Sequence, residues 1–401
     1  MRVDTDSKLD AVFQLQWQSE AAAHTEMLHA ERVNVWRDLL PEALVDGMMG
    51  AQQGDSVHVT FAPGGAVERA KPSRLLRVKS GQFDRSFLSD REMSPRVGRF
   101  YPRGLLQGVP GIYRVNMEPF RCRAVNNGHI DVDFNHPLSD RDLSLTMMIG
   151  NVERKKTERG GTSTDWLESV AAGPGMQARI SGTPTDYFSD NPFRREDERP
   201  DSEFYARPRM VQHIDDTAIE MVQTIYGRHL KEGMRVLDLM SSWQSHIPQN
   251  LHLDALVGVG LNEVELKRNP RLTGYEVKDL NAEPRLPFSD GGFDAAVCTV
   301  SVEYLNNPME VFREIYRVLS PGGVFLVTFS NRWFPPKAIR LWRELHEFER
   351  MGLVLEYFLR SAPYRDLRTY SVRGLPRPRN DRHYPAQLCS DPVYAVWGRK
   401  G

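Results

Sequence analysis

Three polar side chains lie at or just after the ends of short apolar runs in the second half of the chain. Asp238 lies near the end of the run 234–239, Asn262 follows the run 255–260, and Asp279 lies near the end of the run 275–280. A carboxylate in an apolar setting costs several kcal/mol unless it has a partner. The residue types and their positions therefore predict that these strand ends bind a polar ligand.

The segments around these residues alternate between strand-like and helix-like patterns. Apolar runs also cover residues 294–299 and 324–329, and between them lies an amphipathic helix whose apolar stripe includes Phe312 and Ile315. Alternation of this kind predicts an α/β fold, a doubly wound and mostly parallel sheet with helices on both faces. The run 391–399 can add a final strand. Ligands bind such sheets at the carboxyl ends of the strands, so the three polar residues should share one cleft.

An adenosyl ligand offers suitable partners for polar residues at these positions. It presents a ribose diol, an adenine amine and, in S-adenosylmethionine, an α-ammonium group. The 24 residues from Asp238 to Asn262 are typical of the strand–helix–strand interval in nucleoside-binding units, where a polar side chain binds the ribose. The alternative is that these residues only cap strands or helices, and it stays open for all three.

The ordered motifs of residues 201–401 resemble those of a class I S-adenosylmethionine-dependent methyltransferase. They are Val236-Leu-Asp-Leu239, Asp279-Leu280, Leu286-Pro-Phe288, Phe293-Asp-Ala295 and Leu319-Ser-Pro-Gly-Gly323. The resemblance implies a Rossmann-like sheet in which Asp238 holds the methionine end of the cofactor, Asn262 the ribose, and Asp279 with Leu280 the adenine. Ser241 and Thr299 are expected to complete the cofactor site.

The loop after the first of these strands departs from the glycine-rich loop of that family. It reads Met-Ser-Ser-Trp-Gln-Ser-His over residues 240–246. Glycine lets the backbone approach a cofactor closely, and Ser241 and Ser242 are small enough to preserve part of that approach. Trp243 is expected to turn toward the acceptor instead. Since no GxGxxG turn follows any of the strands, the sequence argues against a dehydrogenase.

The acceptor pocket should be formed by the loops after the first, fourth and fifth strands. These loops carry Trp243, His246, Tyr304, Asn331, Trp333 and Phe334. An aromatic, weakly charged pocket favours a small apolar or soft nucleophile such as a thiol, whose pKa of about 8.5 lets one neighbouring base ionise it in part. We expect His246 to be that base, Tyr304 to be a second catalytic residue, and Trp243, Trp333 and Phe334 to line the substrate pocket. A polypeptide acceptor and a non-enzymatic cofactor-binding scaffold are the alternatives.

The first half of the chain shows different patterns. Residues 1–50 are expected to be a helical segment, because Leu28, Val35 and Leu39 share one helical face before Pro41. Residues 51–155 contain short strands broken by Gly, Pro and Asn, which predicts a small β-rich domain. Residues 156–200 are poor in apolar side chains and are expected to form a linker, with the charged run 194–200 in solvent.

One stretch of the predicted β domain resembles the FKBP-type prolyl isomerases of the SlyD group. It runs from Val125 to Leu138 and ends in Asp-Phe-Asn-His-Pro-Leu. The resemblance implies an FKBP-like fold with an inserted flap that binds extended polypeptide. The β domain would then present a peptide or dimerise the chain, and a homodimer is a possible assembly.

Composition excludes several classes of partner. The 52 Lys and Arg residues balance 53 Asp and Glu residues to a net charge of −1, so no overall positive field gathers nucleic acid. No run approaches the roughly 20 apolar residues of a membrane span, and the first residues lack the apolar core of a secretory signal. A cytoplasmic protein is expected. Three scattered cysteines, Cys122, Cys298 and Cys389, predict neither a disulfide framework nor a metal site.

Overall fold

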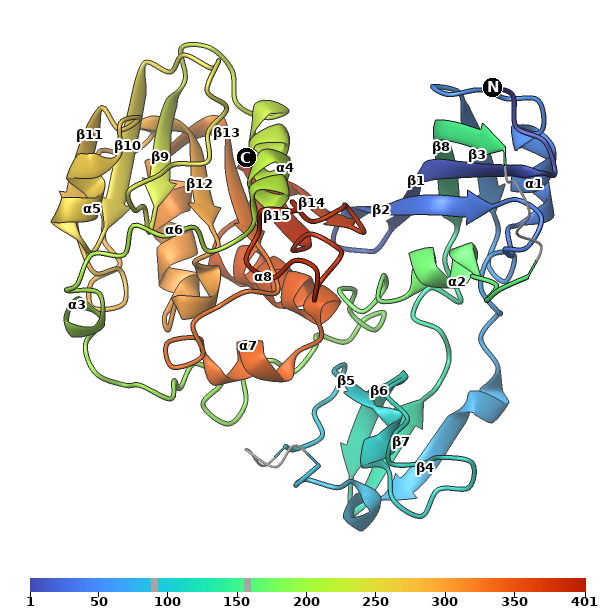
Figure 1. Cartoon of the computed structure of the whole chain (residues 1–401). Coiled ribbons are helices and arrows are strands. Elements are labelled where there is room, and N and C mark those ends of the chain that lie inside the picture. The colour runs from blue at the N-terminus through green and yellow to red at the C-terminus, as the bar shows by residue number, and fades with distance from the viewer. Residues whose placement is uncertain (88–92, 155–159) are drawn as a thin grey trace.

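A computed structural model describes residues 1–87, 93–154 and 160–401. Its main feature is an eleven-stranded sheet that runs through most of the molecule in the order β11-β10-β9-β12-β13-β15-β14-β2-β1-β8-β3. A separate four-stranded sheet lies beside it (Figure 1). The first seven strands in that order come from the C-terminal half of the chain, and the last four come from the N-terminal part.

The C-terminal half has the predicted doubly wound α/β architecture. Its parallel strands are β9 (Arg235–Leu239), β10 (Ala255–Gly260), β11 (Gly274–Val277), β12 (Phe293–Thr299) and β13 (Leu319–Phe329). The last strand, β15 (Val393–Lys400), pairs antiparallel with β13 and with β14 (Tyr364–Arg373). Strand β14 was not predicted. The others lie where the apolar runs indicated.

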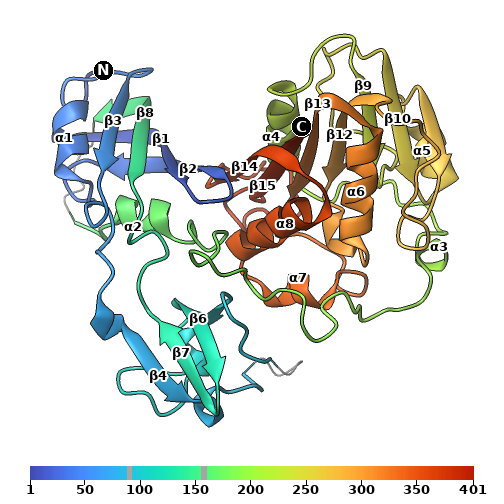
Figure 2. The ribbon, with the colours of Figure 1, turned by 180° about the vertical axis from the view of Figure 1, so that it is seen from behind.

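Helices cover both faces of this part of the sheet (Figure 2). They are α3 (Asp201–Phe204), α4 (Asp216–Gly227), α5 (Glu263–Arg268), α6 (Pro308–Val318), α7 (Arg340–Glu344) and α8 (Glu347–Ser361). Neighbouring residues of β9 point to opposite faces, because side chains alternate along a strand. Val236 therefore packs in one core with α4, and Leu237 packs in the other with α6 and α8.

The prediction that residues 1–50 form a helical segment is wrong for most of that length. Residues Ser7–Gln18 form strand β1 and Ala23–Asn34 form strand β2, an antiparallel hairpin. Every second residue of β1 from Leu9 to Trp17 is buried. This two-residue period of burial is typical of a strand, and it determines the structure here rather than the helical spacing of apolar residues further along the chain. Only α1 (Glu42–Met48) is helical, and it begins after Pro41 rather than ending there.

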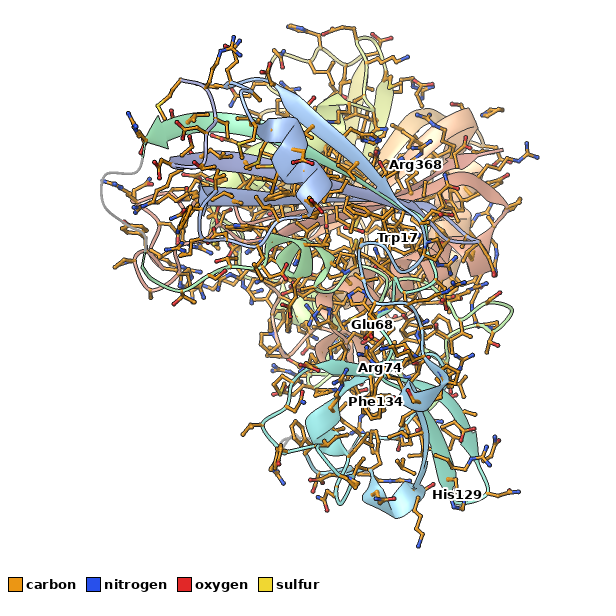
Figure 3. The ribbon with its side chains drawn as sticks, turned by 90° about the vertical axis from the view of Figure 1, so that its right-hand side faces the viewer. Trp17, Glu68, Arg74, His129, Phe134 and Arg368 are labelled. Atoms are coloured by element: carbon orange, nitrogen blue, oxygen red, sulfur yellow. The ribbon has the colours of Figure 1, made fainter. Side chains whose placement is uncertain are left out.

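The N-terminal hairpin is joined to the C-terminal sheet through backbone pairing. Strand β2 pairs in parallel with β14, and on the other side β1 pairs with β8 (Leu143–Arg154), which pairs with β3 (Ser56–Phe61). Figure 3 shows Trp17 and Arg368 at this junction. The buried Glu26 spans it, since its carboxylate accepts hydrogen bonds from Gln177 Nε2 at 2.7 Å and from the hydroxyl of Ser371.

The four-stranded sheet is inserted between β3 and β8. Its strands are β4 (Leu75–Lys79), β5 (Phe100–Pro102), β6 (Pro119–Asn126) and β7 (His129–Asp133). The predicted hairpin at residues 126–128 is confirmed, with positive φ at Asn127 and Gly128. Residues 51–155, predicted to be one β domain, are thus divided between two sheets. The predicted boundary at residue 155 lies outside the described residues.

From residue 160 on, the predicted linker is packed against both parts of the chain rather than solvated, with Met176 and Tyr187 in the core of the C-terminal half. It includes helix α2 (Trp166–Ala171), which packs against the β1–β2 hairpin. In the charged run 194–200, the guanidinium of Arg195 is buried and lies 2.8 Å from Asp201. The fully buried Lys337 reaches the same carboxylate at 3.1 Å. The expectation of a wholly solvated run was wrong, because Arg195 is buried in an ion pair with Asp201, six residues further along the chain.

No helix within the described ranges is both long and apolar enough to cross a membrane.

Candidate functional site

A cleft opens at the carboxyl ends of β9, β10 and β12. Most of the predicted site residues line it, namely Asp238, Ser241, Trp243, His246, Asn262, Asp279, Leu280, Thr299, Tyr304 and Phe334. Trp333 and Asn331 are not among its lining residues. Trp333 packs instead under the guanidinium of Arg350, 4.3 Å from its ring centre.

Asp238 is a buried carboxylate that lines this cleft. Its Oδ2 accepts hydrogen bonds from the hydroxyls of Ser241 at 2.8 Å and Ser245 at 2.6 Å. None of the described residues hydrogen-bonds its Oδ1. Burial raises the pKa of Asp238 to about 6, against the opposing effect of the two hydroxyls. The group can therefore change charge in the mildly acidic range.

The loop after β9 passes directly over the end of β10. Ser241 donates its backbone N–H to Val259 O at 2.8 Å, and a Cβ at Gly260 would lie 2.3 Å from the carbonyl oxygen of Ser241. Only glycine permits this approach. The close backbone passage expected from a glycine-rich loop is thus made possible by a glycine of the neighbouring strand. The sequence analysis missed Gly260, although its place at the end of an apolar run was a signal.

Asn262 serves as the N-cap of α5. Its Oδ1 accepts hydrogen bonds from the backbone of Val264 at 3.0 Å and Glu265 at 3.2 Å. Its Nδ2 donates to the carbonyl oxygens of Tyr205 at 2.8 Å and Ala206 at 3.1 Å. These four bonds use the two donors and both lone pairs of the amide. In this structure Asn262 is a helix cap, as the alternative interpretation of its position states, and it orients the wall of the cleft.

Asp279 lies just beyond β11 at the rim of the cleft. Its Oδ1 accepts hydrogen bonds from the backbone of Asn281 at 2.9 Å and Ala282 at 3.3 Å, and none of the described residues bonds its Oδ2. Leu280 beside it is buried. The side chain of Asn281 also donates to Asp201 at 2.7 Å. These contacts fix the direction of the Asp279 carboxylate.

Thr299 and Tyr304 lie on the β12 side of the cleft. The hydroxyl of Thr299 shares a hydrogen bond of 2.6 Å with the hydroxyl of Tyr226. Tyr304 lies in the turn that follows β12, and its hydroxyl accepts a hydrogen bond from the backbone of Phe334 at 2.8 Å. Burial raises the pKa of Tyr304 well above its usual value. This phenol is therefore protonated at neutral pH and fixes the position of Phe334.

Residues 205–214, which we call the covering segment, form a further wall that the sequence analysis did not assign to the site. Tyr205, Arg209 and His213 of this segment line the cleft. Besides the two bonds from Asn262, the segment is held by Arg209, which donates its backbone N–H to Glu265 at 2.7 Å, and by Trp243, whose Nε1 donates to Val211 O at 3.4 Å. The run of aromatic and basic residues before α4 was the available signal.

The two histidines of the cleft are weak bases. Burial lowers the pKa of His246 to about 4, and partial desolvation lowers that of His213. The Nδ1 of His246 is buried and has no hydrogen-bond partner among the described residues. His213 packs edge-on against Phe334, with ring centres 5.1 Å apart. A neutral imidazole of this kind accepts a hydrogen bond at pH 7 but is poorly matched to remove a proton from a thiol.

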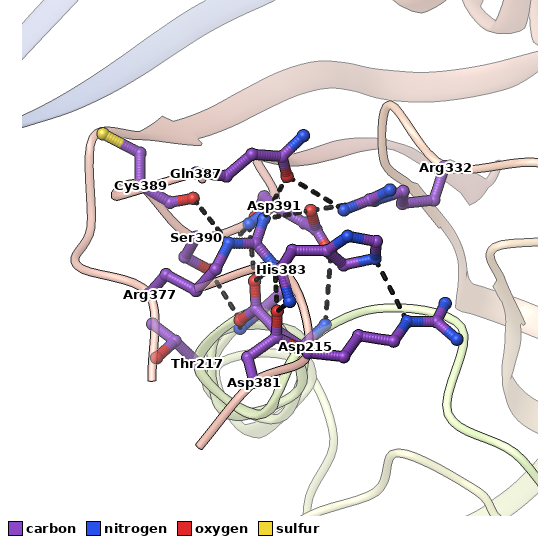
Figure 4. Close-up of polar contacts among 12 residues, drawn as sticks. Asp215, Thr217, Arg332, Arg377, Asp381, His383, Gln387, Cys389, Ser390 and Asp391 are labelled. Atoms are coloured by element: carbon purple, nitrogen blue, oxygen red, sulfur yellow. Dashed lines mark hydrogen bonds and ion pairs between the residues drawn. The ribbon is translucent and has the colours of Figure 1, made fainter. Parts of the chain in front are cut away.

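A buried ionic network holds the covering segment and the loop before Phe334 (Figure 4). The guanidinium of Arg377 contacts Asp391 at 2.6 Å, Asp381 at 2.9 Å and Asp215 at 3.2 Å. Asp215 is also the N-cap of α4, where the covering segment ends. Arg332 joins the network through Asp391 at 3.0 Å. The network therefore fixes both ends of the aromatic side of the cleft.

No group of three or more His, Cys, Asp or Glu side chains in the described part of the chain is arranged to hold a metal ion.

Comparison with known proteins identifies part of this region. Residues 247–327 match the sequence profile of a family described as a methyltransferase domain. A demethylmenaquinone methyltransferase of Paenarthrobacter aurescens is 28% identical over 142 residues, which cover 33% of this chain and 49% of the relative. A sterol 4-C-methyltransferase of Caenorhabditis elegans is 28% identical over 125 residues, or 25% of this chain and 37% of the relative.

A solved S-adenosylmethionine-dependent methyltransferase of Mesorhizobium loti aligns with 46% of this chain and 99% of its own, at 18% identity and a TM-score of 0.32. The chain spans less than half the length of the curated relatives it matches. The match of residues 247–327 covers β10 to most of β13 and so includes much of the cleft. This part of the chain is similar to a methyltransferase domain.

Proposed function

We propose that this protein transfers a methyl group from S-adenosylmethionine to a small-molecule acceptor. The premise is its methyltransferase domain, a class of enzyme whose methyl donor is S-adenosylmethionine. One observation carries the proposal. Asp238 and Asp279, predicted from the sequence as donor-binding residues, line one cleft, and each keeps one carboxylate oxygen that no described residue bonds.

The chemistry of the cleft fits the donor. We assign Asp238 Oδ1 to the α-ammonium group, because a buried carboxylate and an ammonium compensate each other's desolvation. Asp279 and Leu280 would hold the adenosine part, one through a polar contact and one through its apolar surface. Ser241 and Thr299 would complete the walls. Asn262 is a positioning residue in this scheme, since its amide is already used.

The aromatic walls of the cleft support the proposal of a small-molecule acceptor. Trp243, Tyr304 and Phe334 present aromatic surface, and Phe334 packs on Tyr304 with ring centres 6.1 Å apart. The curated relatives are named for sterol and demethylmenaquinone methylation, both reactions of small molecules. A thiol is also a small acceptor and is included in the test below, although the lowered pKa of His246 makes this histidine a weak base for it.

A polypeptide acceptor is the second candidate, and one surface of the inserted sheet favours it. Tyr113, Val115 and Met117 are 73%, 86% and 64% exposed on the loop between β5 and β6. Alternating apolar residues of this kind suit contact with an extended chain. The FKBP-like resemblance would give this surface the task of presenting a peptide. A cofactor-binding scaffold without turnover is the remaining alternative.

An acceptor screen tests the proposal. Purified protein is incubated with S-adenosylmethionine and with thiols, phenols, amines, carboxylic acids or unfolded protein, and formation of the demethylated cofactor is measured. Turnover with a small acceptor, lost in Asp279→Ala and kept in the exposed control Asp216→Ala, is expected. Turnover with unfolded protein alone would reject the small-molecule assignment, and donor binding without any turnover would favour the scaffold.

A further inference from the structure

The guanidinium of Arg209 lies in the cleft without an anion. It stacks on three aromatic rings, 4.3 Å from the ring centre of Phe204 and 5.3 Å from those of Tyr205 and Phe334. Its Nη2 donates to Phe204 O at 3.2 Å. Its Nη1 is buried and has no hydrogen-bond partner among the described residues, and no carboxylate of these residues forms an ion pair with it.

This arrangement leaves a donor to be satisfied from outside the chain. Aromatic faces compensate part of the cationic charge, but they do not replace the hydrogen bond that a buried N–H requires. The nearby Glu265 is already in use. Its Oε1 accepts the backbone N–H of Arg209 at 2.7 Å, and its Oε2 accepts the hydroxyl of Ser242 at 2.5 Å.

The histidines and the tyrosine of the cleft discussed above are poor bases for an acceptor that must first lose a proton. His213 and His246 have lowered pKa values, and Tyr304 has a raised one. An acceptor that enters as an anion needs no such base. A guanidinium N–H binds a carboxylate oxygen through a charge-assisted hydrogen bond, and the aromatic side chains that line the cleft suit a flat molecule.

We propose that Arg209 selects an acceptor bearing a planar carboxylate, which is itself methylated; this rests on the methyl transfer proposed above. One carboxylate oxygen is held by Arg209 Nη1, and the other forms the new bond to the methyl carbon. The carbon–sulfur bond of the sulfonium breaks as that bond forms, and its electron pair goes to sulfur. The products are a methyl ester and a neutral thioether, and no proton is transferred.

The test uses the full chain saturated with S-adenosylhomocysteine and two flat probes of equal size. Benzoate carries the carboxylate, and benzamide lacks the charge. Calorimetry should show benzoate binding about tenfold or more tightly than benzamide to the wild type. Arg209→Gln should abolish this preference, whereas Arg209→Lys should keep part of it because the charge remains. Arg207→Gln, an exposed neighbour outside the cleft, should behave as the wild type.

Affinity for S-adenosylhomocysteine and for adenosine in the same variants separates the possible roles of Arg209. Unchanged affinity for both in Arg209→Gln supports an acceptor role. A loss of tenfold or more for S-adenosylhomocysteine, with adenosine unaffected, would assign Arg209 to the donor's carboxylate and overturn the inference. Equal binding of benzoate and benzamide by the wild type would also overturn it. Failure of the wild type to bind S-adenosylhomocysteine would instead refute the proposed function itself.

Discussion

At the scale of single residues, the cleft is shaped by what each polar group already binds. Asp238 and Asp279 each use one carboxylate oxygen within the protein, and no described residue bonds the other. Asn262 has no free donor or lone pair, because its side-chain amide is fully hydrogen-bonded to α5 and to the covering segment. The sequence placed all three residues at strand ends. It could not show which of them stayed available, since that depends on Tyr205 and Ala206, far away in the chain.

Glu303 is a buried carboxylate next to the site, and its charge state should govern stability at neutral pH. It lies in the single turn Val302–Tyr304, and neither carboxylate oxygen has a hydrogen-bond partner among the described residues. Burial raises its pKa from 4.5 to about 8. Because the folded state favours the protonated form, the resulting stability is present below pH 4.5 and is lost as the pH rises to about 8.

Replacing Glu303 by Gln should therefore stabilise the protein more at pH 9 than at pH 5. Urea denaturation at the two pH values measures the difference, which we expect to be a few kcal/mol in favour of the variant. The same difference for Glu310→Gln, which replaces a half-exposed carboxylate, should be near zero. Equal effects of Glu303→Gln at both pH values would show that Glu303 is already ionised in the folded protein.

Gly260 is the basis of a second prediction at the scale of single residues. A methyl group there would lie 2.3 Å from Ser241 O, whereas one at Gly274 in β11 meets no atom within 4 Å. Gly260→Ala should lower the free energy of unfolding by about 1–3 kcal/mol and weaken donor binding, because the loop that carries Ser241 must move. Gly274→Ala should change neither. Thermal melts and donor titrations of the two variants test this prediction. Equal melting temperatures and equal donor affinities of the two variants would contradict it.

At the scale of elements, the prediction from sequence was strongest where apolar runs are short and regular. The runs that became β9, β10, β12 and β13 are short and mostly buried on both faces. Strand β14 was missed because charged residues interrupt it, as in Arg365-Asp-Leu-Arg368. The β1–β2 hairpin was missed because a helical spacing near its end was given more weight than the alternation within it.

The aromatic and basic residues of the covering segment were a signal in the sequence, but its place as a wall of the cleft depends on residues that are distant in the chain. Arg377 lies more than 160 residues further along the chain and anchors the end of the segment through Asp215. Arg377→Met should destabilise the protein by about 3–5 kcal/mol, since three carboxylates lose a buried cation. The exposed Arg379→Met should have little effect. A Tm for Arg377→Met equal to that of the wild type would mean that the network contributes nothing.

At the scale of the whole molecule, the N-terminal hairpin extends the sheet of the C-terminal half. Without it, β14 would expose an unpaired edge along Arg368–Arg373, and edges of this kind promote aggregation. The inserted four-stranded sheet is attached differently. Its entry and exit lie side by side, since Lys71 and Asn135 exchange two hydrogen bonds of 2.9 and 3.2 Å.

Two deletions should therefore behave differently. Removal of residues 1–155 should give a protein that aggregates or fails to fold, because β14 loses β2 and Ser371 loses Glu26. Replacement of residues 73–133 by a short Gly-Ser connection should give a soluble protein that binds the donor as the full chain does, with a somewhat lower Tm. Solubility, circular dichroism and donor titration distinguish the two. A well-folded, donor-binding fragment 156–401 would show that the shared sheet is dispensable.

Calorimetric titration with S-adenosylhomocysteine at pH 5 and pH 7 tests the central assignment most directly. We predict one bound molecule per chain, with affinity about tenfold weaker at pH 5, because Asp238 with a pKa of about 6 is then mostly protonated. In Asp238→Asn the affinity should be low and equal at both pH values. Absence of binding by the wild type at millimolar ligand, or a pH dependence that survives in Asp238→Asn, would contradict the account.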